Sequence, residues 1–440
     1  MKHLLLLMGR ALALTAVAWG VPLAAHAADA PALDTGSTAW MIAATALLMI
    51  MYLPGLAMFY GGLLRAKNVL SVFTQMLLSA AVVGILFVLY GYSLMLDMTG
   101  AQAGEITLRS FIGGFDKWGL LGINLGAGLV PEGVMVTFLM MFGIISPAIV
   151  TGGFAERIRF PSAVLFLALW FTFAYLPMAH MVWAGPGALL ADWGALDFAG
   201  GTAVHINTGV AALVAAMVLG PRKHYQKMPM PPHNLTMTLI GGGLLWAGWV
   251  GFNVGSGMLV DAKVGTTLLT TQLGACAGIV GWTLIETLRL GRPSALGAIS
   301  GAIAGLVGVT PACAFVGALG AIAIGLAAGA VCFLGCTSLK HRFGYDDTLD
   351  VFGLHGVGGM VGALLTGVFA SPSLGGNVAG LVIGRQVLIQ LASVAFTVVF
   401  SAVVTWLILK LLQWTVGLRV PAEEEEQGLD ISHHNENAYN

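Results

Sequence analysis

The chain has 440 residues, of which 58% are hydrophobic and only 9% are charged, whereas roughly a quarter of the residues in a soluble globular domain carry a charge. This composition indicates a membrane protein that crosses the bilayer several times. The formal net charge of −1 provides no basic face, so nucleic-acid binding is excluded as a function.

The first 27 residues predict a secretory signal that is removed from the mature protein. They begin with a short basic stretch containing Lys2 and Arg10, continue with an apolar run and end in the small-residue pattern Ala-His-Ala. We therefore expect residues 1–27 to be cleaved and the mature chain to begin near Ala28.

Eleven apolar segments follow, each close to the roughly 20 residues that an α-helix needs to cross a bilayer. They cover residues 37–60, 69–97, 129–153, 161–184, 201–220, 234–256, 264–289, 294–311, 313–338, 350–370 and 384–412. The sequence therefore predicts an all-α integral membrane protein with eleven transmembrane helices. Residues 28–413 form the predicted transmembrane domain and residues 414–440 a C-terminal tail.

The distribution of basic residues between the loops predicts the orientation in the membrane. The loops after odd-numbered segments contain Arg65, Lys67, Arg157, Arg159, Arg222, Lys223, Lys227, Arg289, Arg292, Lys340 and Arg342, whereas the other side contains only Arg109, Lys117, Lys263 and Arg385. Lys and Arg accumulate on the cytoplasmic side of membrane proteins. We therefore expect a periplasmic N-terminus, a cytoplasmic tail and a place in the cell inner (cytoplasmic) membrane.

Two similar stretches each place a histidine near the start of an apolar segment. ALDFAGGTAVHINTG at Ala195–Gly209 contains His205, and LDVFGLHGVGG at Leu349–Gly359 contains His355. An ionisable ring inside a membrane is costly unless it has a partner and a task. The two rings therefore predict one shared site, although a structural hydrogen bond between two helices remains the simpler alternative.

The positions of these stretches suggest an inverted repeat. They lie in the fifth and tenth segments, which run in opposite directions if residues 37–220 and 234–370 are two halves of such a repeat, with 384–412 as an extra helix. We expect Asp197 and Asp350 to accept backbone N–H groups at helix starts sunk within the protein. The two rings could then meet at mid-depth.

Aromatic residues gather near the ends of the third, fourth and sixth segments. The set comprises Phe138, Phe142, Trp183, Trp249 and Phe252, with Ser256 one turn beyond the last. Core packing and an interfacial aromatic belt explain this spacing most simply. The alternative is a cation-binding vestibule closed by phenyl rings.

Other polar residues are sparse within the predicted spans, which favours a mostly apolar pore over a multi-charge ion pathway. The cysteines, Cys276, Cys313, Cys332 and Cys336, all lie in apolar runs, so we expect free, buried thiols. Cys332 and Cys336 share a helix face but are too few for a metal site. No metal and no cofactor is predicted.

Eight motifs resemble those of the bacterial ammonium transporters of the Amt family. They are GLAMFYGGL, AERIRF, AHMVW, ALDFAGGTAVHIN, GWVGFNVGS, SGAIAGLVGVTPAC, DVFGLHGVGG and TVGLRVP, in the family's order along essentially the whole mature chain. The resemblance implies a homotrimer with one pore per subunit. Residues 184–192 form a longer loop than is usual, and the second loop also differs, but neither touches the core motifs.

The resemblance also implies roles for individual residues. Matching positions form an outer ammonium site (Trp183, Ser256, Phe142 and the supporting acid Asp197), a phenyl gate (Phe142 and Phe252) and a pore (His205, His355, Trp249 and Thr310).

These residues permit transport with a deprotonation step. An aromatic face attracts a cation by about 0.5–2 kcal/mol, and a hydroxyl acceptor favours the hydrogen-bonding ammonium ion over potassium. An intact ion in a dry pore would cost far more, on the order of tens of kcal/mol. The expected function is conduction of ammonia past two neutral imidazoles, with or without separate proton transfer, and not enzymatic catalysis.

Two other functions are open at this stage. Paired intramembrane histidines can ligate haem in an oxidoreductase, although the small glycine-rich context leaves little room for the macrocycle. An ammonium sensor of the same fold is the other alternative, and the roughly thirty residues expected after the last segment are too few for a folded signalling enzyme.

The tail has two interpretations. Charge patterning makes Glu423–Glu426 a solvated acidic run. The resemblance, carried by GLRVP and GLDISHHNENAYN, instead implies that a trimeric PII nitrogen-signalling protein docks at the cytoplasmic face and plugs each pore.

Overall fold

Helices account for almost all regular structure in residues 32–439, the part of the chain that the computed structural model describes. The signal predicted at residues 1–27 lies outside this range. The α-helices are α2 Thr35–Ile50, α3 Ala57–Leu63, α4 Val69–Leu86, α5 Tyr92–Leu96, α6 Glu132–Phe154, α7 Phe160–Trp170, α8 Leu176–Trp183, α9 Leu189–Asp192, α10 Asn207–Leu219, α11 Leu235–Gly255, α12 Val264–Leu290, α13 Ala295–Val309, α14 Ala318–Leu334, α15 Lys340–Phe343, α16 Val357–Phe369, α17 Ile383–Thr415 and α18 Ala422–Gln427. Within the described range, β-structure is limited to one isolated bridge between Ile158 and Arg419.

Ten helical stretches of the described residues are long and apolar enough to cross a membrane. They are Thr35–Leu63, Ala66–Leu96, Glu132–Phe154, Phe160–Trp183, Gly201–Leu219, Leu235–Gly255, Val264–Leu290, Ala318–Phe343, Phe352–Phe369 and Ile383–Thr415. Each coincides with one of the predicted spans, so the prediction of an all-helical membrane protein is confirmed.

The remaining predicted span, residues 294–311, is shorter than expected. Its helix α13 has 15 residues and is therefore about 22 Å long at 1.5 Å per residue, which is less than the roughly 30 Å of a bilayer core. The chain leaves the helix at Thr310 and continues in turns to Phe315. A total of eleven spans therefore stays a prediction.

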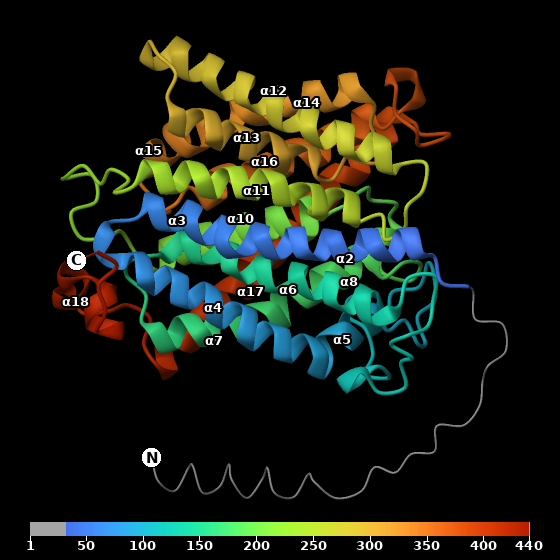
Figure 1. Ribbon diagram of the computed structural model, residues 1–440, viewed down its shortest axis with the longest axis horizontal. Coiled ribbons are helices and arrows are strands. Elements are labelled where there is room, and N and C mark those ends of the chain that lie inside the picture. Colours follow the sequence, from blue (N-terminus) through green and yellow to red (C-terminus); the bar gives the residue numbers. More distant parts are fainter. Residues whose placement is uncertain (1–31, 440) are drawn as a thin grey trace, which may run out of the picture. The chain divides into compact units, whose positions relative to one another are not determined.

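The helices pack in layers that enclose α6 and α10. Figure 1 shows α12, α13 and α14 together on one side, α4, α5 and α7 on the other, and α6 and α10 between them. From Phe138 to Phe154, nearly every residue of α6 is buried. Close packing depends on small residues, because a Cβ on Gly153 would lie 2.7 Å from the carbonyl oxygen of Ala212 on α10.

Several spans contain a π-helical turn. These turns are Met51–Leu56, Phe87–Gly91, Phe171–Tyr175, Gly201–Ile206, Gly335–Leu339 and Phe352–Gly356. Such turns are rare and often occur at functional sites. Two of them, Gly201–Ile206 and Phe352–Gly356, contain His205 and His355.

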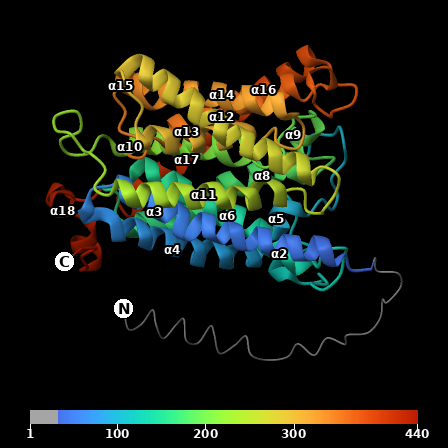
Figure 2. The ribbon, with the colours of Figure 1, turned by 45° about the horizontal axis from the view of Figure 1, so that its top comes forward.

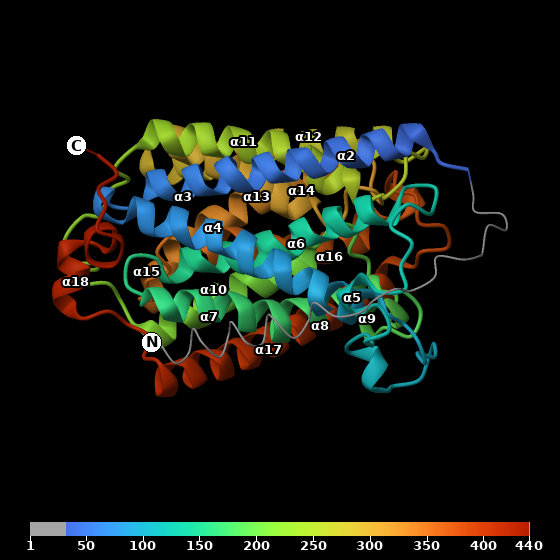
Figure 3. The same cartoon turned by 60° about the horizontal axis from the view of Figure 1, so that its bottom comes forward.

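The two ends of the helix bundle differ. At one end, residues 416–439 with α18 lie against the connections that follow α3 and α6; we call this end the tail face. At the other end, residues 97–131 connect α5 to α6 through two short 3₁₀ turns, Leu108–Ser110 and Trp118–Leu120; we call this end the loop face. Figures 2 and 3 show α18 and α5 at opposite ends of the bundle.

Candidate functional site

His205 and His355 lie side by side in the interior. Their Nδ1 atoms are 3.1 Å apart, their ring centroids are 5.2 Å apart, and both side chains are buried. Each comes from one of the π-helical turns described above, Gly201–Ile206 and Phe352–Gly356. The structure thus brings together the two rings that the sequence predicted to share a site.

Glycines allow these two segments to touch. A Cβ on Gly209, one turn after His205, would lie 2.1 Å from the backbone nitrogen of Gly356, the residue that follows His355. A Cβ on Gly359 would lie 2.9 Å from the carbonyl oxygen of Gly201. The backbones meet where no side chain intervenes, and this contact sets the separation of the two rings.

Asp197 caps the start of the first histidine segment. Its carboxylate accepts the backbone N–H groups of Gly200 (2.8 Å), Gly201 (2.6 Å) and Thr202 (2.7 Å), together with the Thr202 hydroxyl. This arrangement satisfies the otherwise unpaired donors of a buried helix start. The cap expected at Asp197 is confirmed.

The cap of the second histidine segment is Asp347, not Asp350, so the prediction for Asp350 was wrong. Asp347 Oδ2 accepts the backbone N–H of Phe352 at 2.7 Å, whereas Asp350 binds Lys340 Nζ at 2.7 Å. Burial raises the pKa of the Asp347 carboxyl to about 6. The spacing in the sequence could have identified this cap, because Asp197 and Asp347 each precede their histidine by eight positions.

Three cavities follow one another through the bundle. A cavity of about 480 Å³ opens at the loop face and is lined by Phe142, Trp183 and Ser256, among others. Next is a pocket of about 10 Å³ lined by both histidines, which is close to the smallest space that holds one water molecule. A third cavity, of about 350 Å³, shares Leu349 with this central pocket and reaches the tail face.

The rings of Phe142 and Phe252 separate the first cavity from the second. They are stacked with centroids 4.3 Å apart and planes inclined by 24°, and both are buried. Phe142 lines the loop-face cavity and Phe252 lines the central pocket. The phenyl pair therefore lies between the two cavities.

Trp183 and Ser256 lie on the loop-face side of the phenyl pair. Trp183 packs nearly perpendicular to Phe142 at a ring-centroid distance of 5.9 Å, and its Nε1 donates to the backbone carbonyl of Asp197 at 3.1 Å. The Ser256 hydroxyl donates to the carbonyl of Phe252 at 2.8 Å. Because its proton is used there, the hydroxyl oxygen can act only as an acceptor toward the cavity. The Asp197 carboxylate is occupied by its helix cap and does not line the cavity.

Trp249 and Thr310 support the histidine pair. The Trp249 indole stacks on the His205 ring at a centroid distance of 5.5 Å, and its Nε1 donates to Thr310 Oγ1 at 2.9 Å. Trp249 lines the central pocket, whereas Thr310 does not. Thr310 therefore fixes the orientation of the Trp249 indole, and the indole in turn fixes the position of the His205 ring.

His180 and the cysteines line neither the loop-face cavity nor the central pocket. His180 bonds the carbonyl oxygens of Met95 (3.0 Å) and Arg109 (2.7 Å), which fits a structural role. All the cysteines are free, as expected, but the prediction that they are buried was wrong for Cys276, which is exposed, and for Cys336, which is half-buried.

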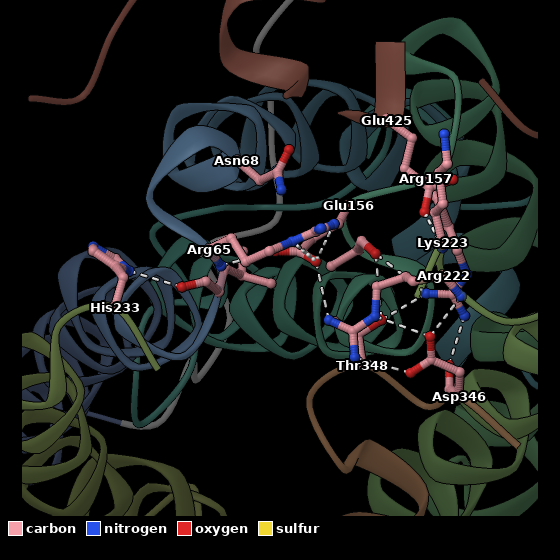
Figure 4. Close-up of polar contacts among 12 residues, drawn as sticks. Arg65, Asn68, Glu156, Arg157, Arg222, Lys223, His233, Asp346, Thr348 and Glu425 are labelled. Atoms are coloured by element: carbon pink, nitrogen blue, oxygen red, sulfur yellow. Dashed lines mark hydrogen bonds and ion pairs between the residues drawn. The ribbon is translucent and has the colours of Figure 1, made fainter. Parts of the chain in front are cut away.

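A buried charge network at the tail face was not predicted (Figure 4). Glu156 accepts the side chains of Arg65 (2.9 Å) and Arg222 (3.0 Å), and Arg222 also binds Asp346 at 2.9 Å. Arg157 donates to the Asp346 carbonyl and the Thr348 hydroxyl, both at 2.6 Å. In the sequence, these arginines indicated only the orientation of the chain in the membrane.

The carboxylates of this network are held in the charged form. Burial alone would raise the pKa of Glu156, but the charges of Arg222 and Arg65 hold it below its usual value. Burial likewise opposes ionisation of Asp346, yet the hydrogen bonds and charge of Arg222 lower the pKa of that carboxyl. Since Asp346 precedes the cap Asp347, the network anchors the segment that carries the second histidine.

The tail docks beside this network. Glu425 accepts the backbone N–H of Lys223 at 2.6 Å and Arg419 Nη2 at 2.8 Å, and Asp430 accepts the N–H of Ser71 at the start of α4 at 2.8 Å. Glu425 is only 2% exposed. The prediction of a solvated acidic run was therefore wrong at this residue.

Comparison with known proteins agrees with the resemblance seen in the sequence. The Ammonium Transporter Family profile matches residues 39–439. The ammonium transporter of Bacillus subtilis (strain 168) is 45% identical over 414 residues, which covers 92% of this chain and 99% of that protein. The chain therefore belongs to the Ammonium Transporter Family and is a transporter, not an enzyme.

Solved structures show the same fold. The crystal structure of Saccharomyces cerevisiae Mep2 matches with a TM-score of 0.78 and 32% identity, covering 90% of this chain and 92% of that chain. A structure described as a sensor Amt protein matches with a TM-score of 0.83 and 26% identity, covering 90% and 98% of the two chains.

Proposed function

We propose that this ammonium transporter binds the ammonium ion at Trp183 and Ser256, deprotonates it at the phenyl gate and conducts ammonia past His205 and His355. The observation that carries the proposal is the hydrogen-bonded histidine pair in an otherwise apolar pocket of about 10 Å³. Such a pocket suits a neutral molecule of the size of water. It does not suit a hydrated ion.

Electrostatics supports deprotonation before the central pocket. The Trp183 face stabilises a cation by about 0.5–2 kcal/mol, and the Ser256 oxygen accepts one of its N–H groups. Beyond the phenyl pair, an isolated charge in a low-dielectric medium costs on the order of tens of kcal/mol. Loss of one proton, either back to solvent at the loop face or along the linked histidines, removes most of this cost.

The histidine geometry supports passage of ammonia. In a neutral pair joined through Nδ1, one ring carries its proton on Nδ1 and the other carries it on Nε2. One Nε2 then accepts a hydrogen bond and the other donates one. His205 Nε2 is buried with no partner among the described residues, so ammonia, which both donates and accepts, can satisfy it. The same linkage offers a route for a separate proton.

The two histidine segments support an inverted repeat of residues 37–220 and 234–370, with 384–412 as the extra helix. Each segment has an aspartate cap, then a π-helical turn containing the histidine, then an α-helix of 13 residues. We propose eleven spans, one of which is formed by α13 together with the turns that follow it to Phe315. The excess of basic residues supports a cytoplasmic tail face and a periplasmic loop face, in the cell inner membrane.

The assembly and the partner are also proposals. Membership of the family supports a homotrimer with one pore per subunit. The docked tail and the basic residues around it support a cytoplasmic surface that a PII-type regulatory protein recognises. The tail-face cavity lies beside this surface and would be the opening that such a partner plugs.

A second candidate is an ammonium sensor of the same fold, favoured by the match to 98% of the sensor Amt protein's chain. A haem oxidoreductase is disfavoured, because a macrocycle between the rings would have to separate nitrogens that now lie 3.1 Å apart. Purified protein in liposomes distinguishes transporter from sensor. A transporter gives an ammonium flux into the liposomes that scales with protein density, and a sensor binds ammonium without flux.

A further inference from the structure

The loop-face cavity contains one carboxylate to which no role has been assigned. Of the residues that line it, Glu132 alone is charged, and the others are apolar, aromatic or hydroxyl-bearing. Glu132 is half-buried and begins α6. A cavity whose only charge is negative attracts cations and repels anions.

The helix places this carboxylate at the mouth of the path to the gate. Glu132, Met135, Leu139 and Phe142 are spaced three to four residues apart and all line the cavity, as expected for one face of a helix. At a rise of 1.5 Å per residue, the ten positions from Glu132 to Phe142 span about 15 Å. The carboxylate is therefore an outer position, and Trp183 and Ser256 are inner ones.

The hydrogen bonds of Glu132 leave it able to bind a cation. Tyr92 Oη donates to Glu132 Oε1 at 2.7 Å. The other carboxylate oxygen, Oε2, takes part in no hydrogen bond or ion pair within residues 32–439. Lys117 lies over the Tyr92 ring, with Nζ 5.6 Å from the ring centroid, and forms no ion pair with Glu132. Because the Tyr92 proton is used on the carboxylate, the phenol oxygen faces an incoming ion as an acceptor.

We infer that Glu132 and Tyr92 form a first binding position for the ammonium ion, which concentrates it in the cavity before it reaches Trp183. This inference rests on the proposed function. The ion donates one N–H to Glu132 Oε2 and another to Tyr92 Oη, then exchanges these acceptors for the Trp183 face and Ser256. The charge of Glu132 attracts ammonium and potassium alike, so selectivity stays with the inner position.

The alternative role of Glu132 is structural. An acid in the first turn of a helix interacts favourably with the helix dipole. The two roles differ in their dependence on salt. The Debye length is about 30 Å at 0.01 M salt and about 3 Å at 1 M, so attraction toward a gate about 15 Å away operates only at low salt. A structural role affects folded yield and maximal current at every salt concentration.

The test compares Glu132→Gln with wild type in proteoliposomes at 0.01 M and 1 M salt. We expect the half-saturating ammonium concentration of the variant to rise roughly 3- to 10-fold at low salt, within the range of electrostatic focusing in charged clefts, and less than about 2-fold at high salt. Maximal current and the preference for ammonium over potassium should not change. Glu132→Asp should restore most of the affinity.

Two control variants sharpen the test. Glu105→Gln removes an exposed carboxylate of the loop face that does not line the cavity, and it should leave the half-saturating concentration unchanged. Lys117→Gln removes the cation above Tyr92 and should lower that concentration at low salt. If the half-saturating ammonium concentration rose in both Glu132→Gln and Lys117→Gln, the substitutions would be distorting the loop, and the inference would be overturned.

A binding measurement tests the proposed position of Glu132 independently of whether the protein transports ammonium. Equilibrium dialysis of methylammonium against detergent-purified protein should show weaker binding by Glu132→Gln at low salt, whether or not the wild type carries current. Absent wild-type ammonium flux into liposomes would refute the proposed function alone. Equal methylammonium affinity of variant and wild type at low salt, or a loss that persists unchanged at 1 M salt, would refute the binding position alone.

Discussion

Replacing Gly209 with alanine is expected to separate the two histidines without altering either ring. The new Cβ would lie 2.1 Å from the nitrogen of Gly356, whereas ordinary contact begins near 3.4 Å. Because backbone atoms cannot rotate away, the two segments must move apart by about 1 Å. The Nδ1 to Nδ1 distance of 3.1 Å would then exceed the length of a hydrogen bond.

The magnitude follows from two opposing terms. Overpacking a tight interior costs about 1–3 kcal/mol, and alanine in a helix returns about 0.5–1 kcal/mol relative to glycine. We expect a modest fall in apparent melting temperature in detergent. Loss of one buried hydrogen bond, worth about 1–1.5 kcal/mol, should lower ammonium-evoked current roughly ten-fold at matched protein density.

The control is Gly243→Ala on α11, where an added Cβ meets no atom within 4 Å. This variant should match or slightly exceed wild type in melting temperature and should carry wild-type current. Full current in Gly209→Ala would refute the argument that glycine contact sets the geometry of the pair.

Three other predictions concern the cap, the tail and the N-terminus. Because burial raises the pKa of Asp347 from 3.8 to about 6, its charge destabilises the folded state above pH 6 by at most about 3 kcal/mol. This cost disappears as the pH falls toward 4. The gain in melting temperature of Asp347→Asn over wild type should therefore be larger at pH 7.5 than at pH 5. An equal gain at both pH values would contradict a buried charge at Asp347. Removal of the residues after Arg419 should weaken inhibition by a PII protein in pull-down and transport assays, and full sensitivity after truncation would exclude the tail from that surface. Intact mass of membrane-purified protein should correspond to a chain that begins near Ala28, and retention of residues 1–27 would show that they are not a cleaved signal.

The sequence predicted the helical spans well because long apolar runs have few other solutions in a membrane. It also predicted the histidine pair, since an ionisable ring within such a run has to be compensated. The span at α13 was predicted too long, because the apolar run continues past Thr310 and Pro311 although the helix does not. Hydropathy measures composition and does not reveal where a backbone turns inside protein.

The buried charges were the main omission. Glu156 and Asp346 lie in connections of the tail face, where charged residues are usually solvated, and only the fold shows that Arg222 bridges them. Asp347 was missed for a different reason. The Leu-Asp pair that the two stretches share led to Asp350, whereas the spacing of eight positions from cap to histidine is the feature common to both segments.

The most direct test of the account measures currents of His205→Leu and His355→Leu in proteoliposomes at matched protein density. Losing one ring leaves the partner nitrogen unpaired, at about 1–3 kcal/mol, and removes the polar edge along which ammonia and its proton would pass. We predict little or no ammonium-evoked current from either variant, while methylammonium binding at Trp183 and Ser256 survives. Wild-type currents in both variants would mean that the histidine pair is a structural link and that conduction follows another path.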